Sequence, residues 1–199
     1  MSPIPPSRAE RMCGAGLRRL ALIAAATACL GGCSAPVVEL PPSLETIRIL
    51  RNQNVPAMAL GPFAPASKDV GHSISIRLGI LHPPKGRNFA EFLGATFETE
   101  LKAAGKLDPA APLQLSGVLT ESRASEDIKN GGGSLGARIT LSRGGQPIFA
   151  KDYRAETKWH SSIIGALAID EAFVQYNALY AALVRQALSD PELVAAAKR

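Results

Sequence analysis

The sequence has few aromatic residues, few cysteines and no long apolar run. Aromatic residues make up 5% of its 199 residues, while hydrophobic residues make up 46%. A core of this composition must be built mainly from Leu, Ile, Val and Ala. The hydrophobic content argues against a disordered chain, and three cysteines are too few for a disulfide scaffold. The length fits a single domain.

The longest apolar run, residues 20–30 (LALIAAATACL), has only eleven residues. A helix that crosses a bilayer needs about 20. The run follows two adjacent arginines and ends in small residues, as the apolar region of a secretory signal peptide does. We therefore predict a signal peptide over residues 1–32, with translation starting at either Met1 or Met12.

Residues 30–33 (Leu-Gly-Gly-Cys) resemble the lipobox of bacterial lipoproteins, in which the cysteine is acylated and becomes the first residue after cleavage. The resemblance implies cleavage between Gly32 and Cys33 and lipidation of Cys33. The other two cysteines precede the cleavage site, so Cys33 has no disulfide partner in the mature chain. The alternative is an ordinary signal peptide with a chance cysteine near its end. In lipoproteins of diderm bacteria, a residue such as Ser34 in place of Asp is typical of outer-membrane sorting.

Removal of the leader also removes most of the net charge. The whole chain has 22 Lys and Arg against 17 Asp and Glu, a net charge of +5. The leader holds four arginines and one glutamate, so the mature chain keeps 18 basic and 16 acidic residues, a net charge of +2. This small excess does not indicate a nucleic-acid-binding surface. We expect the membrane, reached through acylated Cys33, to be one partner.

After Cys33, residues 34–42 (SAPVVELPP) contain three prolines and a single charge. Such a segment is predicted to be a stiff, extended tether, and residues 33–43 together form the anchor. At about 3.1 Å per residue, the tether would hold the folded part about 30 Å from the bilayer. Residues 44–199 are then a single domain that faces the periplasm.

Hydrophobic periodicity divides this domain into helices and strands. Helical spacing predicts helices over residues 44–50, from the cap Asn88 to Gly105, from the cap Asp170 to Leu188, and after Asp190. Alternation predicts strands over residues 55–63, 73–78, 113–120, 137–142 and 147–157, the last two joined by a Gly-Gly hairpin at 144–145. The predicted fold is α+β, with a small, mostly antiparallel sheet and two long helices packed on one face.

Candidate chemistry is sparse in this sequence. The three histidines, His72, His82 and His160, have no helical i, i+4 pairing and no nearby carboxylate cluster, so we predict no metal site and no cofactor. Three consecutive glycines at 131–133 lack the Gly-Lys-Ser/Thr of a phosphate loop and are predicted to form a flexible hairpin tip.

A serine hydrolase is the enzyme hypothesis that the residues permit. Ser161 or Ser162 would be the nucleophile, with His160 and Asp170 completing a triad. Neither serine lies in the G-x-S-x-G motif of a nucleophile elbow, so surface hydroxyls and a helix cap are the favoured interpretation. We predict no catalytic residue and no enzymatic activity.

Residues 159–169 (WHSSIIGALAI) are predicted to be a long apolar connector between the last strand and the final long helix. Such a connector is either packed into the core or exposed for contact with a partner or a lipid. In the second case the contact residues would be Trp159, Ile163, Ile164 and Leu167.

The segments NFAEFLGATFETELKAAGKL, LQLSGVLTES, SLGARITLSRGGQPIFAKDY and FVQYNALYAAL, together with the lipobox, resemble a family of small bacterial envelope lipoproteins. The chain is similar in outline to YajG-type lipoproteins and to the auxiliary lipoproteins of ABC-type envelope transport systems, over residues 73–193. Only Cys33 carries over as a functional residue.

The resemblance implies a lipid-anchored, non-enzymatic accessory or scaffold protein at the outer membrane, facing the periplasm and binding another envelope protein. The alternative is a periplasmic carrier of a lipid or small molecule. Its cargo would occupy an apolar cleft lined by Phe92, Phe97 and Ile163.

Overall fold

The computed structural model describes residues 34–36, 40–72, 74–76, 79–84, 86–161 and 165–199. The chain from Ser34 onward forms one unit. The predicted signal peptide, with Gly32 and Cys33, lies outside the described residues, so its cleavage and lipidation stay predictions.

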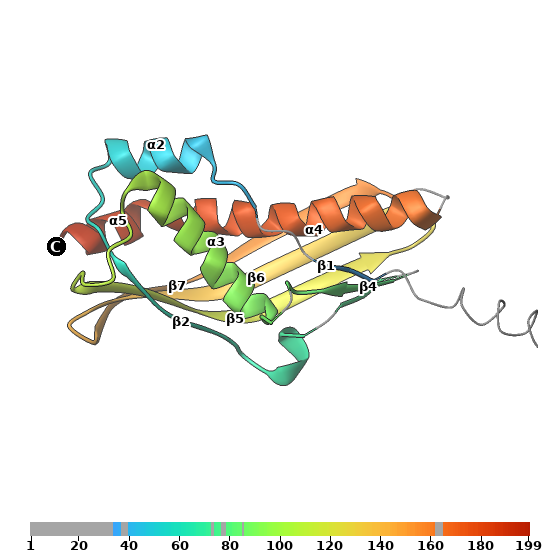
Figure 1. Ribbon diagram of the computed structural model, residues 1–199, viewed down its shortest axis with the longest axis horizontal. Helices are drawn as coiled ribbons and strands as arrows, with labels where there is room; N and C mark the ends of the chain where they lie inside the picture. The colour runs from blue at the N-terminus through green and yellow to red at the C-terminus, as the bar shows by residue number, and fades with distance from the viewer. Residues whose placement is uncertain (1–33, 37–39, 73, 77–78, 85, 162–164) are drawn as a thin grey trace, which may run out of the picture. The chain divides into compact units, whose positions relative to one another are not determined.

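A four-stranded sheet runs through this unit in the order β2-β5-β6-β7 (Figure 1). Its strands are β2 (Ala59–Pro65), β5 (Leu113–Glu126), β6 (Asn130–Arg143) and β7 (Gln146–His160). β5, β6 and β7 pair antiparallel, and β2 pairs parallel to β5. The two edge strands carry prolines, Pro62 in β2 and Pro147 in β7, because a missing backbone N–H is tolerated at a sheet edge.

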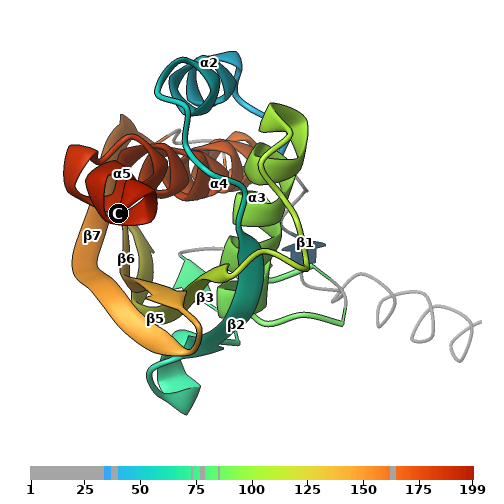
Figure 2. The same ribbon diagram turned by 90° about the vertical axis from the view of Figure 1, so that its left-hand side faces the viewer.

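Helices lie on one side of this sheet, and the first of them packs mainly on the other helices and not on the strands. They are α2 (Leu44–Asn52), α3 (Phe89–Ala104), α4 (Gly165–Leu188) and α5 (Pro191–Lys198), and a short 3-10 turn η1 (Lys68–Val70) follows β2. α3 packs on β2 and β5, whereas α4 packs on β6 and β7. Figure 2 shows α3 and α4 inside the curve of the sheet. The predicted α+β fold is confirmed.

The helix caps and the hairpin turn that the sequence predicts are present in the structure. Asn88 Oδ1 accepts the backbone N–H of Glu91 at 2.9 Å, and Glu91 Oε2 accepts that of Asn88 at 2.8 Å, which completes the capping box of α3. Asp190 caps α5, whose first residue is Pro191. Gly144 and Gly145 have φ angles of +55° and +81°, so they form the predicted β6–β7 hairpin.

The core lies between the sheet and the two long helices, and consists mainly of Leu, Ala, Ile and Val side chains with a few aromatic rings among them. The rings of Phe92 and Tyr180 lie 4.7 Å apart, edge to face, and those of Phe97 and Phe63 lie 5.4 Å apart. Phe92 is 1% exposed and Phe97 is fully buried. Two of the three residues proposed to line a carrier cleft are therefore packed core residues, and the third, Ile163, lies outside the described residues.

Three predictions near the end of the sheet were wrong. Residues 131–133 form no hairpin tip, because they belong to β6 and pair with both neighbours. The connector is shorter than predicted, because β7 extends to His160 and α4 begins at Gly165. Asp170 is an exposed residue within α4 and not its cap. Ala and Leu, which favour helix, extend α4 ahead of it.

The predicted tether also differs from the structure. Its first residues form β1 (Ser34–Pro36), which pairs parallel with β4 (Gly79–His82). β4 pairs antiparallel with β3 (Ile74–Ile76), so a second sheet has the order β1-β4-β3. The expectation that the chain stands free of the domain directly after Cys33 is therefore wrong for these three residues.

Candidate functional site

Among the four residues predicted to contact a partner or lipid, only Trp159 has a described side chain. It is 8% exposed, and its Nε1 donates a hydrogen bond to Glu126 Oε1 at 3.4 Å. Ile163 and Ile164 lie outside the described residues, as does the side chain of Leu167, whose backbone belongs to α4. The burial of Trp159 fits the alternative in which this segment packs into the core.

The residues of the hydrolase hypothesis are not arranged as a triad in the described part of the chain. Ser161 Oγ donates to Glu126 Oε1 at 2.8 Å, and the Ser161 backbone N–H donates to the Lys129 carbonyl at 2.9 Å. His160 and Asp170 are both exposed, and Ser162 lies outside the described residues. Ser161 is thus held by a carboxylate and a backbone carbonyl, which fasten the β5–β6 turn to the end of β7.

No group of three or more His, Cys, Asp or Glu side chains in the described ranges is arranged to hold a metal ion. None of the helices over these ranges is long and apolar enough to cross a bilayer.

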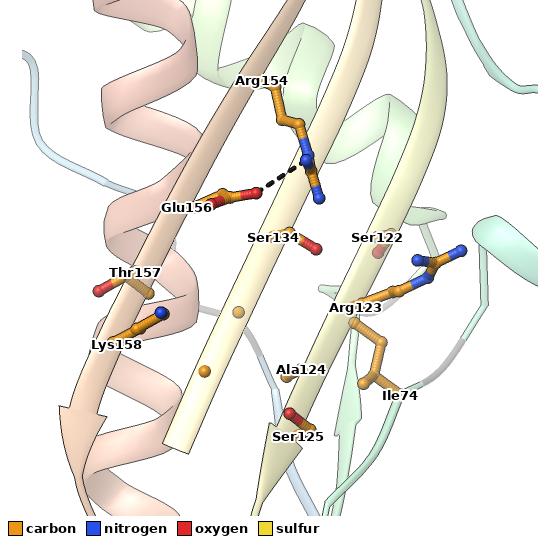
Figure 3. A pocket seen from close by; sticks show the side chains of 12 residues that line it. Ile74, Ser122, Arg123, Ala124, Ser125, Ser134, Arg154, Glu156, Thr157 and Lys158 are labelled. Carbon is orange, nitrogen blue, oxygen red and sulfur yellow. Dashed lines mark ion pairs between the residues drawn. The ribbon is translucent and has the colours of Figure 1, made fainter. Parts of the chain in front are cut away.

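A hollow lies on the half of β5, β6 and β7 that is farther from the Gly144–Gly145 hairpin, on the sheet face that is turned away from α4. Its volume is about 450 Å³. A second hollow of about 520 Å³ adjoins it toward the β5–β6 turn, and both are lined by Ser125, Gly132 and Lys158. We call the two hollows together the glycine groove. Figure 3 shows Arg123, Ser134, Arg154 and Glu156 around the first hollow, with Ile74 of β3 at one side.

The three glycines of β6 explain the shape of this groove. A Cβ at Gly131 would overlap the indole of Trp159, and one at Gly133 would lie 3.1 Å from Leu179 Cδ1, so both glycines admit a side chain on the helix-covered face. Gly132 faces the other way, where an added Cβ would meet nothing closer than the Thr157 carbonyl at 3.8 Å. The missing side chain of Gly132 therefore leaves the floor of the groove open.

The carboxylate of Glu121 binds several polar and charged side chains along the groove. Its Oε1 accepts a hydrogen bond from Ser134 Oγ at 2.7 Å, and its Oε2 lies 3.0 Å from Arg154 Nε. The hydrogen bond from Ser134, followed by the contacts with Arg154 and Arg123, holds the pKa of the Glu121 carboxyl below its ordinary value of 4.5. Arg154 also pairs with Glu156 at 2.8 Å, the contact marked in Figure 3.

Lys158 differs from Arg123 and Arg154, which line the same groove, because those two residues form ion pairs. It is exposed, and no carboxylate among the described residues lies within ion-pair distance of its Nζ. The groove thus offers one cation without an ion-pair partner among the described residues, several hydroxyl groups and a network of paired charges. Its charged and hydroxyl-bearing side chains are of the kind that bind a polar partner.

Sequence reasoning missed the groove, although part of its signal was present. Charged residues alternate along β7 at Asp152, Arg154, Glu156 and Lys158, which is typical of a strand with one solvent-facing side. The missing signal was in β6, because three glycines have no side chains that could reveal alternation. Gly131 packs against Trp159, which lies 28 residues further along the chain, and Gly133 packs against Leu179, so neither contact can be read from the local sequence.

Comparisons with known proteins bear on the fold. No family model matches the sequence, and no curated protein matches it. Protein XCC0632 from Xanthomonas campestris, described with the family DUF330, has 11% sequence identity and a TM-score of 0.53, over 78% of this chain and 95% of that chain.

Two other solved structures are less similar. Hypothetical protein CT253 from Chlamydia trachomatis has 12% identity and a TM-score of 0.40, over 70% of this chain and 94% of that one. A minor lipoprotein from Acinetobacter baumannii has 12% identity and a TM-score of 0.38, over 68% and 94%. TM-scores below 0.5 do not establish a shared fold, and the resemblance to YajG-type lipoproteins stays a prediction. The comparisons therefore show one thing, that this chain shares the α+β fold of XCC0632.

Proposed function

We propose that this chain is a lipid-anchored, non-enzymatic accessory or scaffold protein of the bacterial cell envelope. Acylated Cys33 would hold it at the outer membrane, facing the periplasm, and the glycine groove would bind a segment of another envelope protein. The observation that supports the binding role is the open groove over Gly132, with charged and hydroxyl-bearing side chains around it. The lipobox-like residues 30–33 support the anchor.

The composition of the groove favours a protein segment as its occupant. Charged groups of both signs and hydroxyl groups surround exposed strand backbone, and protein interfaces have such mixed polarity outside their centres. Lys158 is available to a carboxylate of the partner, since it has no ion-pair partner among the described residues. The acyl chain of a lipid would find few apolar side chains here.

The carrier alternative has less support in the described residues. Phe92 and Phe97, which were expected to line its cleft, are packed against Tyr180 and Phe63. No observation on the described residues favours an apolar cargo site over the groove.

Site-specific photocrosslinking in cells tests the binding role. A benzophenone amino acid would replace Ser125 in the groove or, as control, Val118 on the same strand, which is 41% exposed. We expect an adduct with one envelope protein from position 125 and none from position 118. Gly132→Val should abolish the adduct, because the new side chain fills the open floor and Val suits a strand.

Three results would contradict this part of the proposal. They are equal adducts from both positions, an adduct that survives Gly132→Val, and an adduct with lipid alone, which would favour a carrier. A thermal melt of Gly132→Val that matches the parent chain would show that the loss is not caused by unfolding.

The anchor requires a separate test. The mass of the mature chain extracted from membranes should equal that of residues 33–199 with several acyl groups, and Cys33→Ala should leave the protein unacylated and free of the membrane. An intact or merely cleaved chain without acyl groups would overturn the anchor.

A further inference from the structure

The small sheet β1-β4-β3 is the part of the described structure next to the proposed anchor. β1 begins at Ser34, which pairs with Ile80 of β4. Cys33 precedes Ser34 directly in the sequence, and consecutive Cα atoms are 3.8 Å apart. Because Ser34 is already paired, no free linker lies between an acylated Cys33 and this sheet.

The two faces of the small sheet differ in burial. Ile74, Ile76 and Leu81 are buried against the body of the domain, at 8%, 9% and 1% exposure. Ile80 is 43% exposed, and Ser75, which pairs with it across the strands, is also exposed. The described residues of the three strands include no carboxylate on this outer face.

The chain around β3 and β4 is basic. Residues 68–88 contain four Lys or Arg and one Asp, in a mature chain whose net charge is only +2. In the sequence these are Lys68, Arg77, Lys85 and Arg87; Arg77 and Lys85 lie outside the described residues, and Arg87 already has a partner within the chain. Basic segments next to a membrane are attracted to anionic phospholipid headgroups within about 8–10 Å, the Debye length at physiological salt.

From the pairing of Ser34, the exposed Ile80 and this basic segment, we infer that the outer face of the β1-β4-β3 sheet lies against the phospholipid surface of the bilayer. The inference rests on the proposed lipidation of Cys33 and goes beyond it, since it sets how the domain is oriented. Ile74 of β3 also lines the glycine groove, so the groove would open at the end of the domain near the membrane. The Gly144–Gly145 hairpin would point away from it.

Fluorescence quenching in vesicles tests this orientation. The mature chain has Cys33 as its single cysteine, so a cysteine introduced into the acylated protein is the only free thiol. Ile80→Cys places a thiol on the small sheet, and Ile148→Cys, at a residue 37% exposed, places one next to the Gly144–Gly145 hairpin. Each variant would be purified with its acyl groups, labelled with an environment-sensitive dye and inserted into phosphatidylethanolamine and phosphatidylglycerol vesicles.

Nitroxide-labelled lipids should quench the dye at position 80 at least threefold more strongly than the dye at position 148. Replacing phosphatidylglycerol by a neutral lipid should reduce the difference. Equal quenching at the two positions, in protein whose mass confirms acylation, would overturn the orientation while the anchor stands. Protein without acyl groups would overturn both. Thermal melts equal to that of the parent chain would show that neither cysteine disturbs the fold.

Discussion

The near and far halves of the same three strands, β5, β6 and β7, are built differently. In the near half, next to the Gly144–Gly145 hairpin, the helix-facing side chains of Leu115, Ile139 and Leu141 are fully buried. In the far half several of the corresponding positions are polar or lack a side chain, although Leu135 and Trp159 are buried there. Ser122 Oγ lies 2.7 Å from Tyr176 Oη, and Thr157 Oγ1 donates to Gln175 Oε1 at 2.9 Å.

The helices over the two halves differ as well. α4 contacts the far half through Tyr176 and Gln175, whereas α5 reaches the near half, where Arg143 donates to the Ala197 carbonyl at 2.9 Å. Apolar burial supplies most of the stability of a domain, whereas a net hydrogen bond supplies about 1 kcal/mol. The near half therefore secures the fold. The far half can present glycines, hydroxyl groups and charges on its outer face without loss of the core, which suits it to binding.

The largest expected effect is in the near half. Leu115→Ala should lower the free energy of unfolding by about 2–5 kcal/mol, since a fully buried leucine leaves a cavity. Gln114→Ala, at the exposed neighbouring position, should change it by less than about 0.5 kcal/mol. Denaturant unfolding measures both. A smaller loss for Leu115→Ala than for Gln114→Ala would contradict the role assigned to the near half.

Two adjacent glycines face opposite sides of the far half. Gly131 faces the packed side under Trp159, and Gly132 faces the open groove. Gly131→Ala should cost about 1–3 kcal/mol, because its methyl group would overlap the indole of Trp159. Gly132→Ala should cost less than about 0.5 kcal/mol, because its methyl group meets open space. Thermal melts of the two variants provide the comparison, and equal losses would show that the groove floor is not open.

The hydrogen bond and ion pairs of Glu121 should make the free energy of unfolding depend on pH. Its pKa is lowered in the folded chain, so the unfolded chain binds more protons, and this contribution is present above pH 4.5 and is lost as the pH falls through the lowered pKa. Glu121→Gln should make that fall shallower and cost about 1 kcal/mol at neutral pH, a modest loss because Arg154 is 57% exposed and solvent screens the pair.

Urea unfolding at several pH values would measure this effect. Asp152→Asn serves as the control, because Asp152 and its partner Arg138 are 66% and 57% exposed. A parent chain whose acid dependence is unchanged by Glu121→Gln would refute the assigned network.

The smallest effect on stability is expected at Lys158. Lys158→Ala should change the free energy of unfolding by less than about 0.5 kcal/mol, since the side chain is exposed and has no ion-pair partner among the described residues. The same variant should weaken the photocrosslink from position 125, whereas Lys102→Ala on α3 should leave it unchanged. Equal crosslinking in the two variants would remove Lys158 from the proposed binding surface.

Much of the near half could be predicted from the sequence, and little of the far half could. Leu113, Leu115 and Leu119 alternate with polar residues in β5, so their burial follows from the period of a strand. Beyond residue 120 both sides of β5 are polar, and the same test finds no buried face. The strand nevertheless extends to Glu126, because it pairs with β6 along its whole length.

The sequence by itself determined the features that depend on neighbours along the chain. The capping box of Asn88 and Glu91, the Asp190-Pro191 helix start and the Gly-Gly hairpin each need only residues within one turn. Only the tertiary structure decided that residues 131–133 form a strand, that Gly132 opens a groove and that Ser34 pairs with Ile80. Gly131 packs against Trp159, Gly133 packs against Leu179, and Ser34 pairs with β4. Their partners are distant in sequence, and local periodicity carries no information about which distant segments the fold brings together.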